Sequence, residues 1–336
     1  MLNPPPPTKP PIASTPASTP TASSRSTSAN PPDGVSRPES ERCKLATYAD
    51  DTATPTRRHR MLSLSALMAH ITRANNGASL PGQTPWYFRG EAVGHLAPAA
   101  VPLASQHFGP ALDAQNSDQL DALCNDIRDQ IATRWHTEAF GLYTLSDQRM
   151  VATVPRGCVP YLGIQAFGVH ANGFVREHGE LKMWVAKRSQ TKPTFPGQWD
   201  NMVGGGLTAG MSPDDVLAKE AEEEAALDMS RAISVQPAGI LSYCHASDGG
   251  LRNNALYLYD IEVPAGWTPT PNDGEVERFE LWDMPRLRAC IEHTCDFKYN
   301  CNLVIMDFML RHGVIDANEP GYERLKSALN ERFQAA

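Results

Sequence analysis

The chain has 336 residues, of which 41% are apolar and 20% are charged, as is typical of a soluble globular protein with room for two domains and a tail. Its formal net charge of −8 argues against a nucleic-acid partner, because nucleic-acid-binding domains usually present a basic face. No apolar run approaches the roughly 18 residues that a membrane-spanning helix needs. We therefore expect neither nucleic acid nor membrane as a partner, and leave the oligomeric state open. The seven cysteines are scattered and form no CxxC pair, so we expect reduced thiols in a cytoplasmic protein.

Residues 1–60 differ in composition from the rest of the chain. Pro4 to Pro7 are consecutive, and the segment continues in Pro, Ser, Thr and Ala with few large apolar residues. Such a segment cannot bury enough apolar surface to offset the entropy that is lost on ordering. We predict a disordered N-terminal tail.

The composition of residues 61–155 is that of a folded unit. Residues 62–72 predict a short amphipathic helix, and residues 86–103 contain strand-like pieces separated by glycine and proline. In the segment 115–133, leucine and isoleucine recur at helical spacing. We predict a small α+β domain.

Residues 156–316 predict a second domain in which strands and helices follow one another. Three segments have the residue pattern of strands, namely 166–175, 181–188 and 255–263. The strongly apolar segment 302–311 predicts a helix. A C-terminal helical tail over 317–336 completes the predicted organisation.

The segment with the clearest chemistry is a glycine-rich loop that leads into a helix. Gly204, Gly205 and Gly206 are consecutive, and glycine lets a backbone approach a ligand closely. Ser212 is a good helix N-cap, and Pro213 is well placed at the first helical position. We therefore expect a loop followed directly by a capped helix.

Four glutamates of this helix separate by angle. At about 100° per residue, Glu220, Glu223 and Glu224 fall within a fan of about 100°, whereas Glu222 points away. Converging carboxylates repel one another unless a cation lies between them, and hard oxygen ligands suit Mg²⁺ or Mn²⁺. The simpler alternative is that these glutamates form only the charged, solvent-facing side of a surface helix. The glycine loop directly before the helix favours a ligand site instead, because glycine lets the backbone approach a ligand closely.

This stretch resembles the Nudix box, the signature of the Nudix hydrolase superfamily. Gly205 corresponds to its first glycine, and its three clustered glutamates correspond to Glu220, Glu223 and Glu224. Three positions depart from the pattern: they are Met211 in place of a glutamate, Lys219 in place of the arginine and Ala226 in place of the second glycine. The core of the motif, from 220 to 224, is intact.

Further segments are similar to one branch of this superfamily. These segments are 167–174, 184–189, Lys192, 195–201 and 272–277. That branch includes the Nudix part of fungal thiamin pyrophosphokinase fusions and plant plastid Nudix hydrolases. The resemblance implies a Nudix α/β/α sandwich with a mixed sheet, preceded by the small extra domain. It also implies that thiamin diphosphate, or an oxidised or damaged form such as oxothiamin or oxythiamin diphosphate, is cleaved to the monophosphate.

The same resemblance assigns the metal site. Glu220, Glu223 and Glu224 would bind Mg²⁺, with Mn²⁺ as an alternative, and a carbonyl near Gly205 would complete the coordination. Glu275 lies where many Nudix enzymes place a late catalytic glutamate. We expect Lys219 to orient a glutamate through a salt bridge.

Substrate-binding residues are predicted around the glycine loop. Arg188 and Lys192 are candidates for binding phosphate, and Gly205 would let the backbone approach the ligand. Asp200 and Asn201 directly precede the loop, where they would hydrogen-bond the pyrimidine of a thiamin-like substrate. The structural alternatives are solvated charge for the two cations and a capped turn for Asp200 and Asn201.

Three functions stay open from the sequence. The first is a diphosphatase for thiamin-type substrates, and the second is a hydrolase of nucleoside diphosphate derivatives. The third is a Nudix module that binds a ligand without catalysis. The intact glutamate cluster favours the first two.

Overall fold

A computed structural model describes residues 57–331 except 78 and 248, with side chains from residue 64 onward. The predicted disordered tail over 1–60 therefore lies outside the described residues, apart from the start of helix α1 (Arg57–Ala74). None of the helices in this part of the chain is long and apolar enough to cross a membrane.

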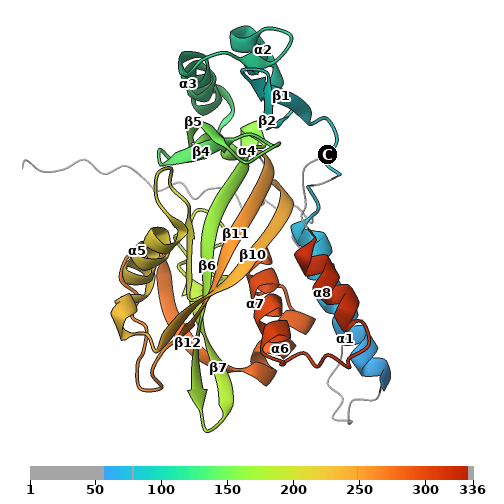
Figure 1. Cartoon of the computed structure of the whole chain (residues 1–336), viewed down its shortest axis with the longest axis vertical. Coiled ribbons are helices and arrows are strands. Elements are labelled where there is room, and N and C mark those ends of the chain that lie inside the picture. Colours follow the sequence, from blue (N-terminus) through green and yellow to red (C-terminus); the bar gives the residue numbers. More distant parts are fainter. Residues whose placement is uncertain (1–56, 78, 248, 332–336) are drawn as a thin grey trace, which may run out of the picture. The chain divides into compact units, whose positions relative to one another are not determined.

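A seven-stranded mixed sheet forms the centre of the fold (Figure 1). Its main path runs in the order β10 (Ser234–Ser247), β11 (Gly250–Glu262), β6 (Gln165–Glu177), β7 (Glu180–Arg188) and β12 (Val276–Asp283). Strands β11 and β6 are parallel, and the other neighbours on this path are antiparallel. Two short strands, β8 (Trp199–Asp200) and β9 (Val203–Gly206), pair with β7 and β6 respectively.

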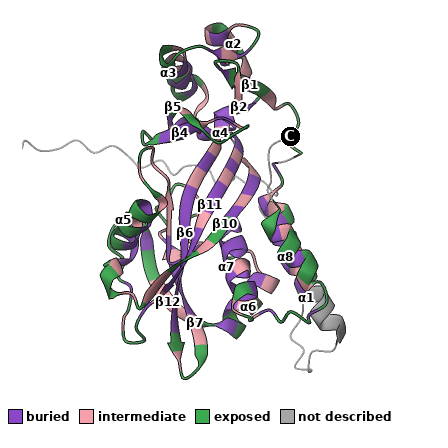
Figure 2. Ribbon diagram, viewed as in Figure 1, coloured by how far each residue is buried: buried purple, intermediate pink, exposed green. Residues whose placement is uncertain are grey.

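Helices cover both faces of this sheet, because the side chains of each strand alternate between two apolar cores. Val175 of β6 lies in the core beneath α5 (Pro213–Ala225). The preceding residue, Phe174, lies in the opposite core with α7 (Tyr299–Arg311) and α6 (Met284–His293). Figure 2 shows the buried strands between these layers. The predicted α/β/α sandwich with a mixed sheet is confirmed.

The segment from 84 to 166 builds a separate apolar core around Trp86, which is fully buried. Its strands are β1 (Thr84–Phe88), β2 (Glu91–Leu96), β3 (Asp113–Ala114), β4 (Ala139–Tyr143) and β5 (Met150–Pro155). Its helices are α2 (Val101–Phe108), α3 (Ser117–Asp126), a π-helical turn (Ile127–Ile131), a 3-10 turn (Arg156–Cys158) and α4 (Val159–Leu162). The Trp86 indole N–H donates to the carbonyl of Leu162 at 2.9 Å, which fixes β1 against α4.

Helix α1 packs differently from what the predicted domain boundary at residue 61 implies. Leu67 and Ile71 lie in the core of α6 and α7, and His70 Nε2 lies 2.7 Å from the carbonyl oxygen of Ile291. Helix α8 (Tyr322–Asn330) buries Leu325 and Leu329 in the same core. The smaller core thus begins near β1, and α1 belongs with the helices that cover the main sheet.

Candidate functional site

The glycine-rich loop and the following helix have the predicted local structure. Strand β9 pairs antiparallel with β6, with Gly205 opposite Val169. Ser212 caps α5: its Oγ accepts from the Asp215 N–H at 3.2 Å, and the two residues form a reciprocal capping box. Pro213 stands at the first helical position, where its missing N–H costs nothing. The cap sets the start of α5 and therefore the direction of its glutamates.

Glu224 and Glu220 face the glycine loop. Glu224 is 9% exposed, and its carboxylate accepts from the Gly204 N–H at 2.8 Å. Glu220 lies directly over Gly205, where a Cβ atom would come within 2.4 Å of the Glu220 Cδ. Glycine at 205 is thus required for the close approach of this carboxylate to the backbone.

Both carboxyl groups are poorly stabilised as anions. Burial raises the pKa of Glu224 well above its usual value, and the charges of Asp200, Glu220 and Asp273 raise it further. Burial also raises the pKa of Glu220. Among the described residues, no cation forms an ion pair with Glu224. A buried carboxylate among like charges normally needs a cationic partner.

Of the remaining glutamates of the helix, Glu223 lies at the exposed rim of the cluster and Glu222 points away from it. Glu223 has a side chain that is 49% exposed, and Lys219 Nζ lies 2.5 Å from it and 3.2 Å from Glu220. Glu222 is exposed, as its angle predicts. The structure therefore divides the predicted fan into the buried Glu224 and the half-buried Glu220 on the loop, and Glu223 at the rim, which Lys219 links to Glu220.

These residues fit a hard divalent cation. Glu220 and Glu224 offer oxygen donors beside a glycine backbone, and Glu224 combines burial with like-charged neighbours. Glu275 and Glu223 add to the negative field at Glu220. Oxygen donors of this kind suit a hard divalent cation rather than a soft one bound by thiolates.

A second group of potential ligands suits a metal poorly. Ligand atoms of His170, Asp200 and Cys301 all lie within 4.8 Å of one another and are buried. However, Asp200 already lies 2.7 Å from Arg188 and 3.5 Å from Lys298. Burial also raises the pKa of the Cys301 thiol well above its usual value, so the sulfur keeps its proton and donates to Asp200. Because two cations already lie beside Asp200, this group is a poorer cation site than the glutamates of α5.

The predicted substrate residue Arg188 is engaged within the protein. Its guanidinium donates to Asp200 at 2.7 Å and to the carbonyls of Thr194 and Phe195 at 2.8 and 3.0 Å. Burial opposes ionisation of Asp200, but Lys298 and Arg188 outweigh it and hold the pKa of this carboxyl well below its usual range. This buried pair fixes the segment before the glycine loop and leaves Arg188 with little capacity for a phosphate.

Asn201 is likewise part of a buried network. Its side chain lies 2.8 Å from His170 Nδ1 and donates to Asn172 at 3.0 Å. Burial lowers the pKa of His170 to about 4, so the imidazole is neutral near pH 7. The His170 ring also covers Gly204, so this network supports the loop from the face opposite to Glu220.

Lys192 and Glu275 lie together at the rim as an ion pair. The Glu275 side chain is 49% exposed, and its charge contributes to the raised pKa of Glu220. The structure thus gathers Glu220, Glu224 and Gly205 with Glu275 nearby.

The smaller core also contributes to this region, which the sequence did not indicate. Phe140 of β4 covers Gly206, where a Cβ atom would come within 2.6 Å of its ring. The Ala209 N–H donates to the carbonyl of Ala139 at 2.8 Å. Glu138, which pairs with Arg156 at 2.7 Å, is close enough for Lys219 to help lower its pKa. No local pattern in the sequence marks these long-range contacts.

Comparison with known proteins agrees with this geometry. The NUDIX domain model matches residues 167–293. Nudix hydrolases 20 and 24, both chloroplastic, of Arabidopsis thaliana are 39% and 38% identical over 180 and 170 residues. These matches cover 54% and 51% of this chain, and 48% and 47% of the relatives. The chain thus spans about half the length of these two relatives.

A third relative covers more of the chain. An uncharacterised protein of Saccharomyces cerevisiae is 30% identical over 236 residues, which is 62% of this chain and 68% of that protein. Together with the domain match and the loop–helix geometry, these similarities establish the family. The chain belongs to the Nudix superfamily.

Proposed function

We propose that this protein is a Mg²⁺-dependent hydrolase that cleaves a diphosphate linkage of a small molecule, yielding a monophosphate and phosphate. One observation carries the proposal: Glu220 and the buried Glu224 converge on the backbone of Gly204 and Gly205, and Glu224 has no cationic partner among the described residues. Membership of the Nudix superfamily supports the same activity, as do the names of the Arabidopsis relatives.

The residues of this site would have different roles according to where they lie. Glu220 and Glu224, with Glu223 at the rim, would hold the cation, which supplies charge neutralisation for the diphosphate and makes water more acidic. Lys219 keeps Glu220 oriented through its contacts with Glu220 and Glu223. Gly205 leaves room for Glu220 to reach the loop.

The ion pair of Lys192 and Glu275 at the rim would bind phosphate and accept a proton. Lys192 carries a positive charge that suits a phosphate, and its contact with Glu275 holds both groups beside the carboxylate cluster. We assign Glu275 a catalytic role as a proton acceptor. Asp200 and Asn201, although engaged in buried networks, fix the segment that leads into the glycine loop.

We assign the substrate to the thiamin diphosphate class, including its oxidised and damaged forms. The support is the similarity of the segments around 167–174, 195–201 and 272–277 to the thiamin-associated Nudix branch. A nucleoside diphosphate derivative is the second candidate, and ligand binding without catalysis is the third. Cytoplasmic location also stays a prediction, because the two Arabidopsis relatives are chloroplastic by name.

A substrate panel tests the proposal. Formation of the monophosphate product by the full chain is measured with Mg²⁺, with Mn²⁺ and with EDTA, using thiamin diphosphate, oxythiamin diphosphate, ADP and a nucleotide sugar, since a nucleotide sugar yields two phosphomonoesters and no free phosphate. We expect metal-dependent product formation that is fastest with the thiamin-type compounds. Faster product formation from the nucleotides would transfer the assignment to the second candidate. Metal-dependent binding without turnover of any compound would make the protein a binding module.

A further inference from the structure

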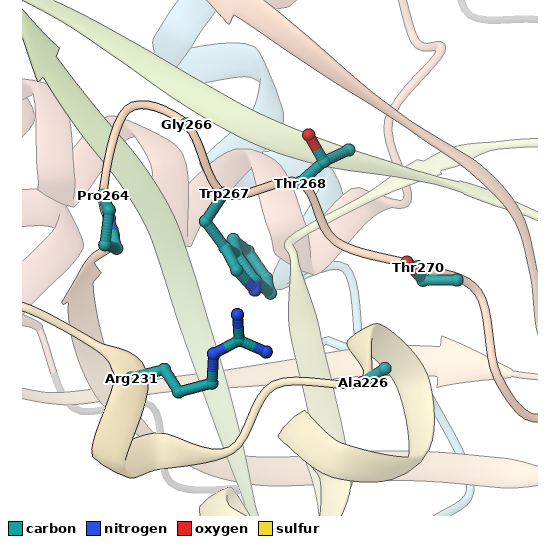
Figure 3. Close-up of a pocket in the computed structure, with 7 residues that line it drawn as sticks. All are labelled: Ala226, Arg231, Pro264, Gly266, Trp267, Thr268 and Thr270. Carbon is teal, nitrogen blue, oxygen red and sulfur yellow. The ribbon is translucent and has the colours of Figure 1, made fainter.

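A separate cavity lies at the C-terminal end of α5. Its volume is about 590 Å³, and it lies between a 3-10 turn (Met229–Arg231) and the loop that connects β11 to β12. The residues that line it include Ala226, Arg231, Pro264, Trp267, Thr268 and Thr270 (Figure 3). Small-molecule sites in proteins commonly have volumes of roughly 300–1,000 Å³. None of these lining residues belongs to the carboxylate site.

Two side chains give this cavity a defined chemistry. In Figure 3, Arg231 and Trp267 point toward one another from opposite walls of the cavity. The Trp267 indole is partly buried against the core beneath α5, which limits its freedom to move. Arg231 is exposed, and its guanidinium forms no ion pair or side-chain hydrogen bond within the described part of the chain. The Trp267 indole can stack on a planar ring, and the unpaired Arg231 guanidinium can bind an anion. Together they suit a planar ring that carries an anionic group.

The neighbouring carboxylate, that of Asp228, forms no ion pair with the Arg231 guanidinium. Asp228 caps the 3-10 turn by accepting from the Ser230 N–H at 2.9 Å. This hydrogen bonding is the main cause of the lowered pKa of Asp228, and the charge of Arg231 is a smaller contribution. The Asp228 carboxylate is thus hydrogen-bonded to the backbone of the turn rather than paired with Arg231.

Arg231 is also not needed to cap the end of α5. A cation near a helix C-terminus often satisfies the last carbonyls. Here the carbonyl of Ala225 accepts from the Thr270 N–H at 3.0 Å. The carbonyl of Glu222 accepts from the Ala226 N–H at 3.1 Å and from the Asn272 side chain at 3.2 Å. The loop therefore caps the helix by itself and leaves the guanidinium for another partner.

We propose that this cavity binds a heteroaromatic ring that carries a phosphate, with the ring on Trp267 and the phosphate on Arg231. Thr268 and Thr270 also line this cavity, although the Thr268 hydroxyl points away from Arg231 in Figure 3. The site is distinct from the proposed catalytic site, but the two are connected. The loop from 264 continues to Asp273 and Glu275, whose charges raise the pKa values of Glu224 and Glu220. A ligand that displaces this loop would therefore also influence the carboxylate site.

Binding of adenosine 5′-monophosphate to the full chain tests this site. Calorimetric titrations in EDTA keep metal-dependent binding at the carboxylate site from contributing. Adenosine and inorganic phosphate, each alone, serve as probes of the ring and the anion. We expect saturable binding of the monophosphate that is at least tenfold tighter than binding of either part. Equal affinity for phosphate alone, or no binding of the monophosphate, would overturn the proposal.

Variants locate the binding and separate it from the catalytic site. Arg231→Gln and Trp267→Leu should each weaken monophosphate binding at least tenfold, while the exposed control Arg324→Gln on α8 should leave it unchanged. Glu224→Gln should also retain full binding, which keeps this test independent of turnover. Loss of binding in Glu224→Gln with retention in Arg231→Gln would place the ligand in the carboxylate site and refute the assignment. Trp267→Phe preserves packing if the leucine variant does not fold, and it should bind more weakly than the native chain.

Discussion

Replacing Glu224 by glutamine is the most direct test of the carboxylate site. The substitution keeps the size of the side chain and an oxygen that accepts from the Gly204 N–H, but it removes a charged ligand. Loss of one such ligand typically costs about 3 kcal/mol of transition-state stabilisation, or roughly a hundredfold in rate. Glu222→Gln is the matched control on the same helical turn, and because Glu222 is exposed its effect should stay within about 0.5 kcal/mol.

Stability gives an independent measure of the same variant. Without metal, Glu224→Gln should raise the Tm, because burial and the charges of Asp200, Glu220 and Asp273 oppose ionisation of Glu224. With Mg²⁺ at about a hundred times its Kd, the native protein should gain about 2.7 kcal/mol. For a domain of this size that corresponds to a rise in Tm of roughly 5–10 °C. The variant should lose most of this rise, whereas Glu222→Gln should keep it.

The two assays together can refute the reasoning. Turnover is measured as Mg²⁺-dependent phosphate release, and Tm by differential scanning calorimetry with and without Mg²⁺. Equal and small effects of substitutions at 220, 222 and 224, together with no Mg²⁺-dependent change in Tm, would mean that α5 presents only a charged surface. The proposed hydrolase function would then lose its metal site.

Three further outcomes follow from individual residues. Gly205→Ala should lower kcat roughly a hundredfold with little change in Tm, because the added Cβ would lie 2.4 Å from Glu220 Cδ and would displace that carboxylate; steady-state kinetics and calorimetry measure this. Ala226→Gly should stabilise the protein by about 0.5–1 kcal/mol in urea unfolding, because Ala226 has φ +51°, where a Cβ is unfavourable; a loss of stability would contradict this. Burial lowers the pKa of His245 to about 4, with smaller contributions from Arg252 and Arg73. Since the unfolded chain takes up the proton first, stability should fall as the pH drops from about 6.5 to about 4; His245→Gln should reduce this slope in urea titrations at several pH values, and an unchanged slope would contradict the assignment.

The glycine loop and the helix that follows could be predicted because their signals are local. Ser212, Pro213 and the consecutive glycines act within a few residues of themselves, and each takes the predicted conformation. The angular separation of Glu222 from Glu220 and Glu224 likewise follows from helix geometry alone. For the same reason the predicted strands over 166–175 and 181–188 lie within β6 and β7, and the predicted strand over 255–263 overlaps β11, which ends at Glu262.

The features that could not be predicted from the sequence depend on contacts between residues far apart in the chain. Helix α1 lies against α6 through a contact between residues that are 221 positions apart, and no local pattern encodes that partner. Strand β10 was not predicted, because Pro237 and Gly239 interrupt its pattern at a bulge. Arg188 has the sequence context of an exposed phosphate ligand, yet its side chain is only 10% exposed and is paired with Asp200. Burial of this kind depends on the whole fold.

The departures from the Nudix box acquire a physical meaning in the structure. Met211 stands where the pattern has a glutamate, and it is partly buried against the core beneath α5, so no carboxylate reaches the site from that position. Orientation of Glu220 therefore falls to Lys219, which bridges Glu220 and Glu223 at 3.2 and 2.5 Å. A lysine holds its partners as a point charge rather than through the planar, bidentate geometry of arginine. The buried Glu224 accepts from the Gly204 N–H and pairs with neither Lys219 nor another described cation, so its orientation does not depend on the lysine that replaces the arginine.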